Sequence, residues 1–400
     1  MILKIERLNH TGEGVGTKDG IVFFVPKTIP GDIINLKEKD IIHHKNYNEV
    51  TNYTLIEKSK DRVKVDCPYY QECGGCQLMH LSYENQLHYK KEKVKEIFKK
   101  YANIEIDPEI IPSNQFKYRN KITLQVKNGE LGLFLEKTNH IIPINTCLLI
   151  PDNINKIIPL LQKLNIKELN QIILKTINQE VMVQFIGKIN KDEVIDTLKD
   201  KVASIYINNT LIKGTPFLTE NLPPYQFKVS PNSFFQINHE STINLYNKVK
   251  EYLGNNNKDI LDLYCGTGTI GIYVSENCNK ITGIEINESS VKDAKENIKI
   301  NHLKNINIIK GNVGEILKSN KEYDAIIVDP PRSGLDKRTI KTLEEIKSPK
   351  IIYISCNPIT LARDINRLNN NYTLKEITLV DMFPNTYHVE TVIILKRKTS

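Results

Sequence analysis

The sequence contains no run of 18 apolar residues, so a membrane-spanning helix is not expected. Its first residues lack the basic and then apolar pattern of a secretory signal, and we therefore expect a cytoplasmic protein. The seven cysteines are too few and too unevenly spread among 400 residues for a secreted disulfide scaffold. With 40% hydrophobic and 26% charged residues, the composition also excludes wholesale disorder.

Composition and pattern divide the chain into three zones. Residues 1–57 contain short apolar stretches between glycine-rich turns, a pattern typical of a small β-barrel. Residues 58–228 predict a mixed α+β domain, whereas residues 229–400 alternate strand and helix and predict a parallel sheet with crossover helices. We therefore expect an α/β protein of three domains. The net charge of +8 permits a polyanionic partner without proving one.

Apolar periodicity predicts individual elements in the last two zones. In the central zone we expect a lysine-rich helix from Tyr83 to Tyr101 and strands at 121–126, 130–135, 171–176 and 181–185. In the C-terminal zone we expect strands at 259–264, 280–285, 306–310, 323–328, 350–355, 374–380 and 391–396. Helices are expected between them at about 240–253, 288–301, 336–346 and 359–369.

A glycine-rich loop follows the first C-terminal strand and opens a helix. Gly266, Gly268 and Gly271 match G-x-G-x-x-G, which lets the backbone approach a nucleotide, so Gly266 is a candidate cofactor contact. Glu285 ends the second strand, where a carboxylate can accept both ribose hydroxyls. NAD is one interpretation. We favour S-adenosylmethionine because the loop reads D-L-Y-C-G-T-G and a later strand ends in D-P-P-R, which suits a flat base beside a methyl donor.

A cysteine and further carboxylates fall at the same edge of the predicted sheet. Tyr264, Glu285, Asp329 and Cys356 each stand at the carboxyl end of a strand, where an open parallel sheet binds its ligands. The last strand is expected to run antiparallel to the others. Its beginning, Glu390, would then face the same edge.

A thiol, a carboxylate and a methyl donor at one edge indicate carbon methylation of a pyrimidine. C5 of uracil is too weak a nucleophile to attack a methyl sulfonium unaided, but addition of a thiolate to C6 creates an enolate that can. We expect Cys356 to be this nucleophile, because a thiolate both attacks and leaves well. Glu390 is the candidate base that removes the C5 proton. Cys265 and Cys278 are expected to be structural.

At these residues the sequence resembles the RNA uracil-5 methyltransferases. The matching segments are F-Q-I-N at 235–238, D-L-Y-C-G-T-G-T at 262–269, D-P-P-R at 329–332, S-C-N-P at 355–358 and H-V-E at 388–390. The resemblance covers essentially the whole chain and implies a Rossmann-like class I methyltransferase domain over 229–400. It implies methyl-donor contacts from Gln236, Tyr264, Glu285 and Asp329, with Cys356 as nucleophile and Glu390 as general base.

Residues 1–57 look like a TRAM domain, an RNA-binding barrel related to the OB-fold. The likeness rests on H-T-G-E-G-V-G at 10–16 and on V-P and I-P-G-D between 25 and 32. Two further segments could contact RNA. The strand that starts K-Y-R-N-K at 117–121 mixes basic and aromatic side chains, which can pair with phosphates and stack on a base. The helix lysines Lys90, Lys91, Lys93, Lys95, Lys99 and Lys100 are candidates too, a solvated helix face being the alternative.

A cysteine cluster opens the central zone. Cys67, Cys73 and Cys76 are spaced C-x5-C-x2-C, and Cys147 is the candidate fourth ligand. Four thiolates suit either tetrahedral zinc or a [4Fe–4S] cluster. Resemblance to the ribosomal-RNA branch of the family favours iron–sulfur, with a structural role. Radical methylthiotransferases, which also carry TRAM domains, use C-x3-C-x2-C, so radical chemistry is not expected.

We expect a monomeric enzyme that makes 5-methyluridine in 23S ribosomal RNA, at a flipped or single-stranded target. The rival substrate for the same chemistry is transfer RNA. Three different classes of protein compete with this interpretation: an amino-nitrogen methyltransferase, a non-enzymatic RNA-binding assembly factor and a NAD oxidoreductase. Arg332 in place of an aromatic residue, with Cys356 and Glu390, argues against amino-nitrogen methylation.

Overall fold

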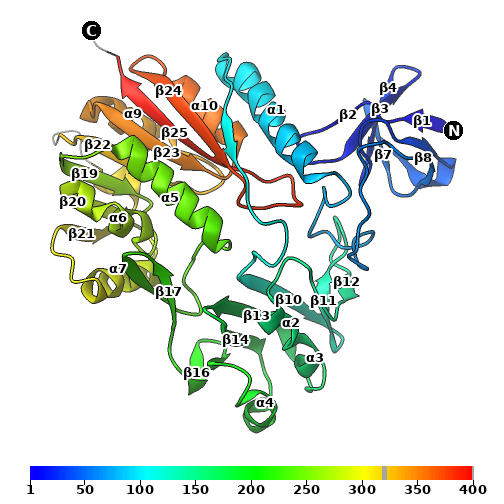
Figure 1. The fold of residues 1–400 in the computed structure, drawn as a ribbon, viewed down its shortest axis with the longest axis horizontal. Coiled ribbons are helices and arrows are strands. Elements are labelled where there is room, and N and C mark those ends of the chain that lie inside the picture. The colour runs from blue at the N-terminus through cyan, green and yellow to red at the C-terminus, as the bar shows by residue number, and fades with distance from the viewer. Residues whose placement is uncertain (318–321, 399–400) are drawn as a thin grey trace.

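The N-terminal residues form two small sheets around one core (Figure 1). The computed structural model describes residues 1–317 and 322–398. The first sheet has the order β1-β5-β8, and its strands are Ile2–Lys4, Ile33–Asn35 and Thr54–Glu57. The second has the order β2-β3-β4-β7-β6, and its strands are Arg7–Leu8, Gly14–Lys18, Ile21–Val25, Tyr47–Val50 and Ile41–His43. A short 3-10 helix, η1, spans Glu38–Asp40.

Apolar side chains from both N-terminal sheets share one interior. Leu3, Phe23 and Ile34 are buried there together. Removing such side chains from water is the main favourable term for a domain of this size. The short strands predicted for residues 1–57 are present, and their closure into a barrel stays a prediction.

Helix α1 (Tyr83–Ala102) and strand β9 (Glu109–Ile111) pack with the C-terminal sheet. Val94, Ile97 and Phe98 on one face of α1 enter the same core as residues of α10, beside which α1 lies in Figure 1. Strand β9 pairs in parallel with β24 at the edge of that sheet. The expected central zone of 58–228 therefore includes a segment that packs elsewhere, because an apolar helix face does not specify which core it enters.

A seven-stranded sheet follows, with the order β12-β11-β10-β13-β14-β15-β16. Its strands in chain order are β10 (Lys121–Lys127), β11 (Glu130–Phe134), β12 (Ile141–Pro143), β13 (Leu169–Ile177), β14 (Glu180–Gly187), β15 (Ser204–Ile207) and β16 (Thr210–Gly214). Three short helices pack near it: α2 (Asp152–Asn155), α3 (Ile158–Leu161) and α4 (Lys191–Leu198). The four predicted strands of this sheet are confirmed within a few residues, and β12, β15 and β16 were not expected.

A hairpin of β17 (Leu218–Leu222) and β18 (Tyr225–Val229) leads into the C-terminal sheet. That sheet has the order β21-β20-β19-β22-β23-β25-β24-β9. Its strands are β19 (Asn257–Leu263), β20 (Cys278–Glu285), β21 (Ile306–Lys310), β22 (Ala325–Val328), β23 (Lys350–Ser355), β24 (Tyr372–Val380) and β25 (Glu390–Arg397). All seven strands expected here are present.

Helices cover both faces of this sheet (Figure 1). They are α5 (His239–Leu253), α6 (Thr269–Tyr273), the 3-10 helix η2 (Ser275–Asn277), α7 (Glu288–Ile300), α8 (Val313–Ile316), α9 (Lys337–Ile346) and α10 (Pro358–Leu368). Each face has its own apolar core, as strands buried on both sides require. Within the described ranges, no helix is long and apolar enough to cross a membrane.

Candidate active site

Four parallel strands of the C-terminal sheet end at one edge. Strands β19, β20, β22 and β23 are parallel, and their ends bring Tyr264, Glu285, Asp329 and Cys356 to that edge. Strand β25 is antiparallel to β23, with Thr391 opposite Ser355, so Glu390 starts its strand beside Cys356. The predicted antiparallel direction of the last strand is therefore confirmed, and so is the position of these residues at one edge of the sheet.

The strand order reverses beside β19. The chain passes from β19 through β20 to β21 on one side and then crosses to β22 on the other. A crevice opens at such a reversal, outside the carboxyl ends of the strands, and open α/β sheets bind their ligands there.

Two of the three motif glycines in this loop adopt a left-handed backbone. Tyr264, Gly266 and Gly268 have φ of 61°, 55° and 77°, in the left-handed region that glycine occupies without strain. The carboxylate of Glu285 accepts a hydrogen bond from the Gly266 N–H at 3.0 Å and another from the Asn287 N–H at 2.7 Å. Glu285 is therefore fixed against the loop.

Three buried carboxyl groups surround this edge. Burial raises the pKa of Asp262 to about 8, and the neighbouring Asp329 adds to the shift. Burial alone raises the pKa of Asp329 to about 7. Burial, followed by Asp329, raises the pKa of Glu390 to about 8, while Arg332 opposes the shift. No described residue hydrogen-bonds Oδ1 of Asp262, which leaves a buried acceptor facing no protein partner. Such a set of acids can hold a cationic ligand and accept a proton.

Cys356 is half-buried and has Arg332 as a neighbour. Burial and Glu390 raise the pKa of the thiol, whereas the charge of Arg332 and its hydrogen bond to the thiol lower it. Both residues line a pocket of about 180 Å³ together with His388. Burial lowers the pKa of His388 to about 3, so its ring is neutral. The role of Arg332 was not predicted, although its position in D-P-P-R beside the candidate nucleophile was a usable signal.

Two of the predicted methyl-donor residues have other partners. Gln236 lies between β18 and α5, is 9% exposed, and accepts a hydrogen bond from Asn120 through its backbone carbonyl. Among the described residues, no hydrogen bond joins the side chain of Gln236 to the carboxylates above. The side chain of Tyr264 hydrogen-bonds Thr339 and packs against the core of the sheet. Their assignment as donor contacts stays a prediction.

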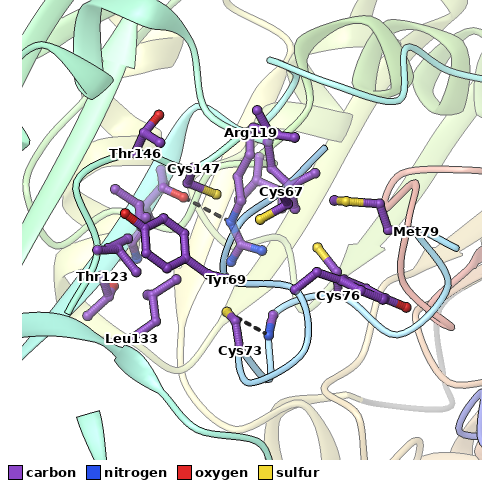
Figure 2. A pocket seen from close by; sticks show the side chains of 18 residues that line it. Cys67, Tyr69, Cys73, Cys76, Met79, Arg119, Thr123, Leu133, Thr146 and Cys147 are labelled. Carbon is purple, nitrogen blue, oxygen red and sulfur yellow. Dashed lines mark hydrogen bonds between the residues drawn. The ribbon is translucent and has the colours of Figure 1, made fainter. Parts of the chain in front are cut away.

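The four predicted metal ligands line one cavity of about 320 Å³ (Figure 2). Cys67, Cys73 and Cys76 reach it from the loop before α1, and Cys147 reaches it from the central region. Burial raises the pKa values of Cys73, Cys76 and Cys147, and the neighbouring thiols raise them further. Within residues 1–317 and 322–398, no group of three or more His, Cys, Asp or Glu side chains has the arrangement of a metal-ion site.

The predicted RNA-binding face at 117–121 is not a continuous surface. Arg119 points into the cysteine cavity, and its Nε donates to the Lys121 carbonyl at 3.0 Å (Figure 2). Tyr118 is buried, and its hydroxyl donates to the Pro384 carbonyl at 3.0 Å. Lys117 pairs with Asp152 at 2.6 Å. Tyr118 and Arg119 therefore contact partners within the protein and do not form one exposed face with Lys117, and RNA binding by this segment stays a prediction.

Several lysines of α1 also have carboxylate partners. Lys90 is fully buried and pairs with Asp381, while Lys91 and Lys95 share Asp107 at 2.9 Å each. Lys99 pairs with Glu105 at 3.0 Å. The helix is therefore not one continuous basic face.

The strand order, the glycine loop and the buried carboxyl groups beside it are those of an α/β methyltransferase fold, and similarity to known proteins identifies the group within it. The profile of the tRNA (uracil-5-)-methyltransferase family matches residues 82–398. An uncharacterized RNA methyltransferase of Caldanaerobacter subterraneus is 34% identical, with 98% of this chain and 97% of the relative covered. One from Staphylococcus aureus is 33% identical, with 98% and 96% covered.

A solved structure is similar over the full length. The tRNA (uracil-54, C5)-methyltransferase of Pyrococcus abyssi, in complex with S-adenosyl-L-homocysteine, is 31% identical and superposes with a TM-score of 0.83. The match covers 99% of this chain and 100% of that one. The chain therefore belongs to the RNA (uracil-5-)-methyltransferase family, whose members are S-adenosylmethionine-dependent enzymes acting on RNA.

Proposed function

We propose that this enzyme transfers a methyl group from S-adenosylmethionine to C5 of a uridine in 23S ribosomal RNA. The observation that carries the chemistry is the placement of Cys356 beside Glu390 at the edge where Glu285 and Asp329 also stand. A nucleophile, a base and a cofactor crevice then share one rim of the sheet. When bound, S-adenosylmethionine supplies an electrophilic methyl group.

The protein residues divide the rest of the reaction between them. The Cys356 sulfur adds to C6 of uracil, and the electrons of the C5–C6 double bond move into an enolate whose C5 accepts the methyl group. Glu390 then takes the C5 proton as general base. The electrons of that C–H bond restore the double bond as the sulfur–C6 bond breaks and the thiolate returns. Arg332 supports the first step because its charge favours the thiolate over the thiol.

Glu285 and Asp329 are the donor-binding residues in this proposal, together with the backbone at Gly266. Glu285 already holds the Gly266 N–H, so its carboxylate stands beside the loop that approaches the nucleoside. Burial raises the pKa of Asp329 to about 7, and in its ionised form, which a nearby sulfonium favours, this carboxylate would supply negative charge to the methyl donor. Gln236 and Tyr264 complete the set by resemblance to the family.

We propose that the cysteine cavity holds a [4Fe–4S] cluster, whose binding would bring the four thiols into a ligand arrangement that the described side chains do not have. Four thiols from two separate segments line one space, and the guanidinium of Arg119 enters it. A four-thiolate cluster carries net negative charge, which a neighbouring guanidinium stabilises. We assign Cys67, Cys73, Cys76 and Cys147 as the ligands and give the cluster a structural role.

The choice of 23S ribosomal RNA rests on the resemblance of the cysteine spacing and of residues 1–57, as a TRAM domain, to that branch of the family. A second candidate is transfer RNA. It is favoured by the Pyrococcus abyssi enzyme, whose name gives a transfer-RNA substrate and whose whole length matches this chain.

Mapping of 5-methyluridine in ribosomal and transfer RNA from cells lacking this protein tests the proposal. We expect the modification to disappear from 23S ribosomal RNA and to return with the wild-type gene but not with Cys356→Ala. Loss from transfer RNA alone would establish the second candidate. If both RNAs keep their 5-methyluridine, the proposed function is wrong.

A further inference from the structure

Lys93 lines the pocket that holds Cys356, although it belongs to α1 and not to the C-terminal sheet. His10 and Thr11 of the N-terminal region and Tyr387 line the same pocket. Lys93 itself is only 7% exposed. None of the residues that line this pocket is acidic, so it favours an anionic ligand.

No carboxylate of the described chain balances the charge of Lys93. Its ammonium donates a hydrogen bond to the Tyr387 carbonyl and lies 5.2 Å and 5.7 Å from the ring centroids of Tyr387 and Tyr89. Within the described ranges, no carboxylate oxygen lies within 4.0 Å of the Lys93 ammonium. Glu96, one turn further along α1, lies 3.7 Å from His10 instead. A buried ammonium without a counter-charge is costly unless a ligand supplies one.

Lys90 provides the contrast, since it lies one turn earlier on the same helix. Its ammonium is fully buried, lies 2.5 Å from Asp381 and donates to the Phe383 carbonyl at 3.0 Å. Lys90 is therefore satisfied within the protein. Lys93 keeps donor capacity for another group, because an ammonium carries three N–H donors and the carbonyl of Tyr387 takes one.

We propose that Lys93 is a positioning residue that binds a backbone phosphate of the target nucleotide while Cys356 engages its base. This inference rests on the proposed function. Uracil is neutral, so the flanking phosphodiester is the anion that a flipped nucleotide brings into the pocket. Burial, with the charge of Lys90, lowers the pKa of Lys93 to about 7, and a bound phosphate would favour its charged form.

Lys93 is not among the charged groups that act most strongly on the reacting thiol. The charges that act most on the Cys356 thiol are those of Glu390 and Arg332. The charge of Lys93 instead acts on His10 and His388. Lys93 is therefore assigned to the phosphate and not to the enolate.

A short RNA that contains the mapped uridine tests this inference when either flanking phosphate is replaced by a neutral methylphosphonate. We expect one replacement to weaken binding to wild-type enzyme about tenfold, the loss of one charged hydrogen bond. Lys93→Met should bind the unmodified RNA about tenfold more weakly, with kcat unchanged. The methylphosphonate that weakens binding to wild-type enzyme should not weaken binding to this variant any further. For Lys93→Met, the plot of the logarithm of the RNA binding constant against the logarithm of the salt concentration should have a slope shallower by about 0.7–0.9.

Lys99→Met is the matched control. It also removes one positive charge from α1, but Lys99 is 71% exposed and pairs with Glu105, so RNA affinity should not change. Wild-type enzyme that methylates the RNA yet tolerates a methylphosphonate at both positions would overturn the inference and leave the proposed function intact. A lower kcat for Lys93→Met at unchanged affinity would also overturn it. Failure of the wild-type enzyme to methylate any RNA would contradict the proposed function instead.

Discussion

Asp262, Asp329 and Glu390 hold protons near neutral pH because each carboxyl group is buried. Their pKa values lie at about 8, about 7 and about 8. The methyl donor carries a positive sulfonium, which favours the ionised form of a nearby carboxyl group. Binding of the donor is therefore coupled to proton release from this group of acids.

The affinity for S-adenosylmethionine should rise with pH. The cation prefers the ionised acids, so affinity is gained as pH rises toward their pKa values of about 7 to 8 and levels off above about pH 8. Release of one proton corresponds to a gain of about tenfold per pH unit. Calorimetric titration between pH 6 and 8.5 measures this. S-adenosylhomocysteine, whose sulfur is neutral, is the control, and its affinity should depend less on pH. If the affinities of the two ligands change equally with pH, donor binding is not coupled to proton release.

Helix α1 is attached to the segment that leads into Glu390. Both members of the Lys90–Asp381 pair are fully buried at 2.5 Å, and Tyr83 of the same helix donates to Asp381 at 3.0 Å. Gln86 accepts from the Asn385 N–H at 2.8 Å. The segment before Glu390 therefore takes its position from α1 as well as from the sheet.

Lys90→Met should lower the free energy of unfolding by about 3–5 kcal/mol, because it leaves the Asp381 carboxylate buried and unpaired. Lys90→Met/Asp381→Asn should recover part of the loss, since no buried charge then lacks a partner. Urea unfolding followed by circular dichroism measures both variants. Lys99→Met is the exposed control and should change stability by less than about 0.5 kcal/mol. Equal stability of Lys90→Met and Lys99→Met would show that the ion pair contributes nothing.

Helices and strands could be predicted from the sequence where the apolar periodicity continued over the full length of the element. All seven C-terminal strands and the helix α1 follow from periodicity, and β21 and β23 have the predicted bounds. Which core α1 enters was not predictable, because an amphipathic face fits any apolar surface. The three residues of β9 are too few for a strand signal. Among the site residues, the edge positions followed from topology, whereas the direction of Arg119 depends on tertiary neighbours.

The three regions of the molecule meet around the cysteine loop and the catalytic pocket. Lys27 of the N-terminal region donates to the carbonyls of Tyr70, Gln71 and Cys73 at 2.5, 2.9 and 3.2 Å. The same region is attached to α1, because Tyr89 donates to the Asn9 carbonyl at 2.8 Å. A cluster held by the cysteine loop would therefore stabilise the N-terminal region and the central sheet together.

Protein purified without oxygen should be brown and contain about four irons per chain if the four cysteines hold a [4Fe–4S] cluster. Cys76→Ser should lose the colour and lower the melting temperature, because the loop would lose its anchor. Cys278→Ser is the control, since Cys278 lies outside this cavity. Metal analysis and visible absorption measure the content. One zinc per chain without visible absorption would contradict the iron assignment and leave the ligands in place.

The assignment of Cys356 and Glu390 is tested most directly by trapping the covalent intermediate. In Glu390→Gln the thiolate can still add and the methyl group can still transfer, but the C5 proton has no acceptor, so the sulfur–C6 bond cannot break. Denaturing electrophoresis should show a protein–RNA complex, and mass spectrometry should find methylated uridine attached to Cys356. Cys356→Ala should form no complex and no product while still binding RNA and S-adenosylmethionine. An adduct on Cys265, or rapid turnover by Glu390→Gln without any trapped complex, would contradict the account.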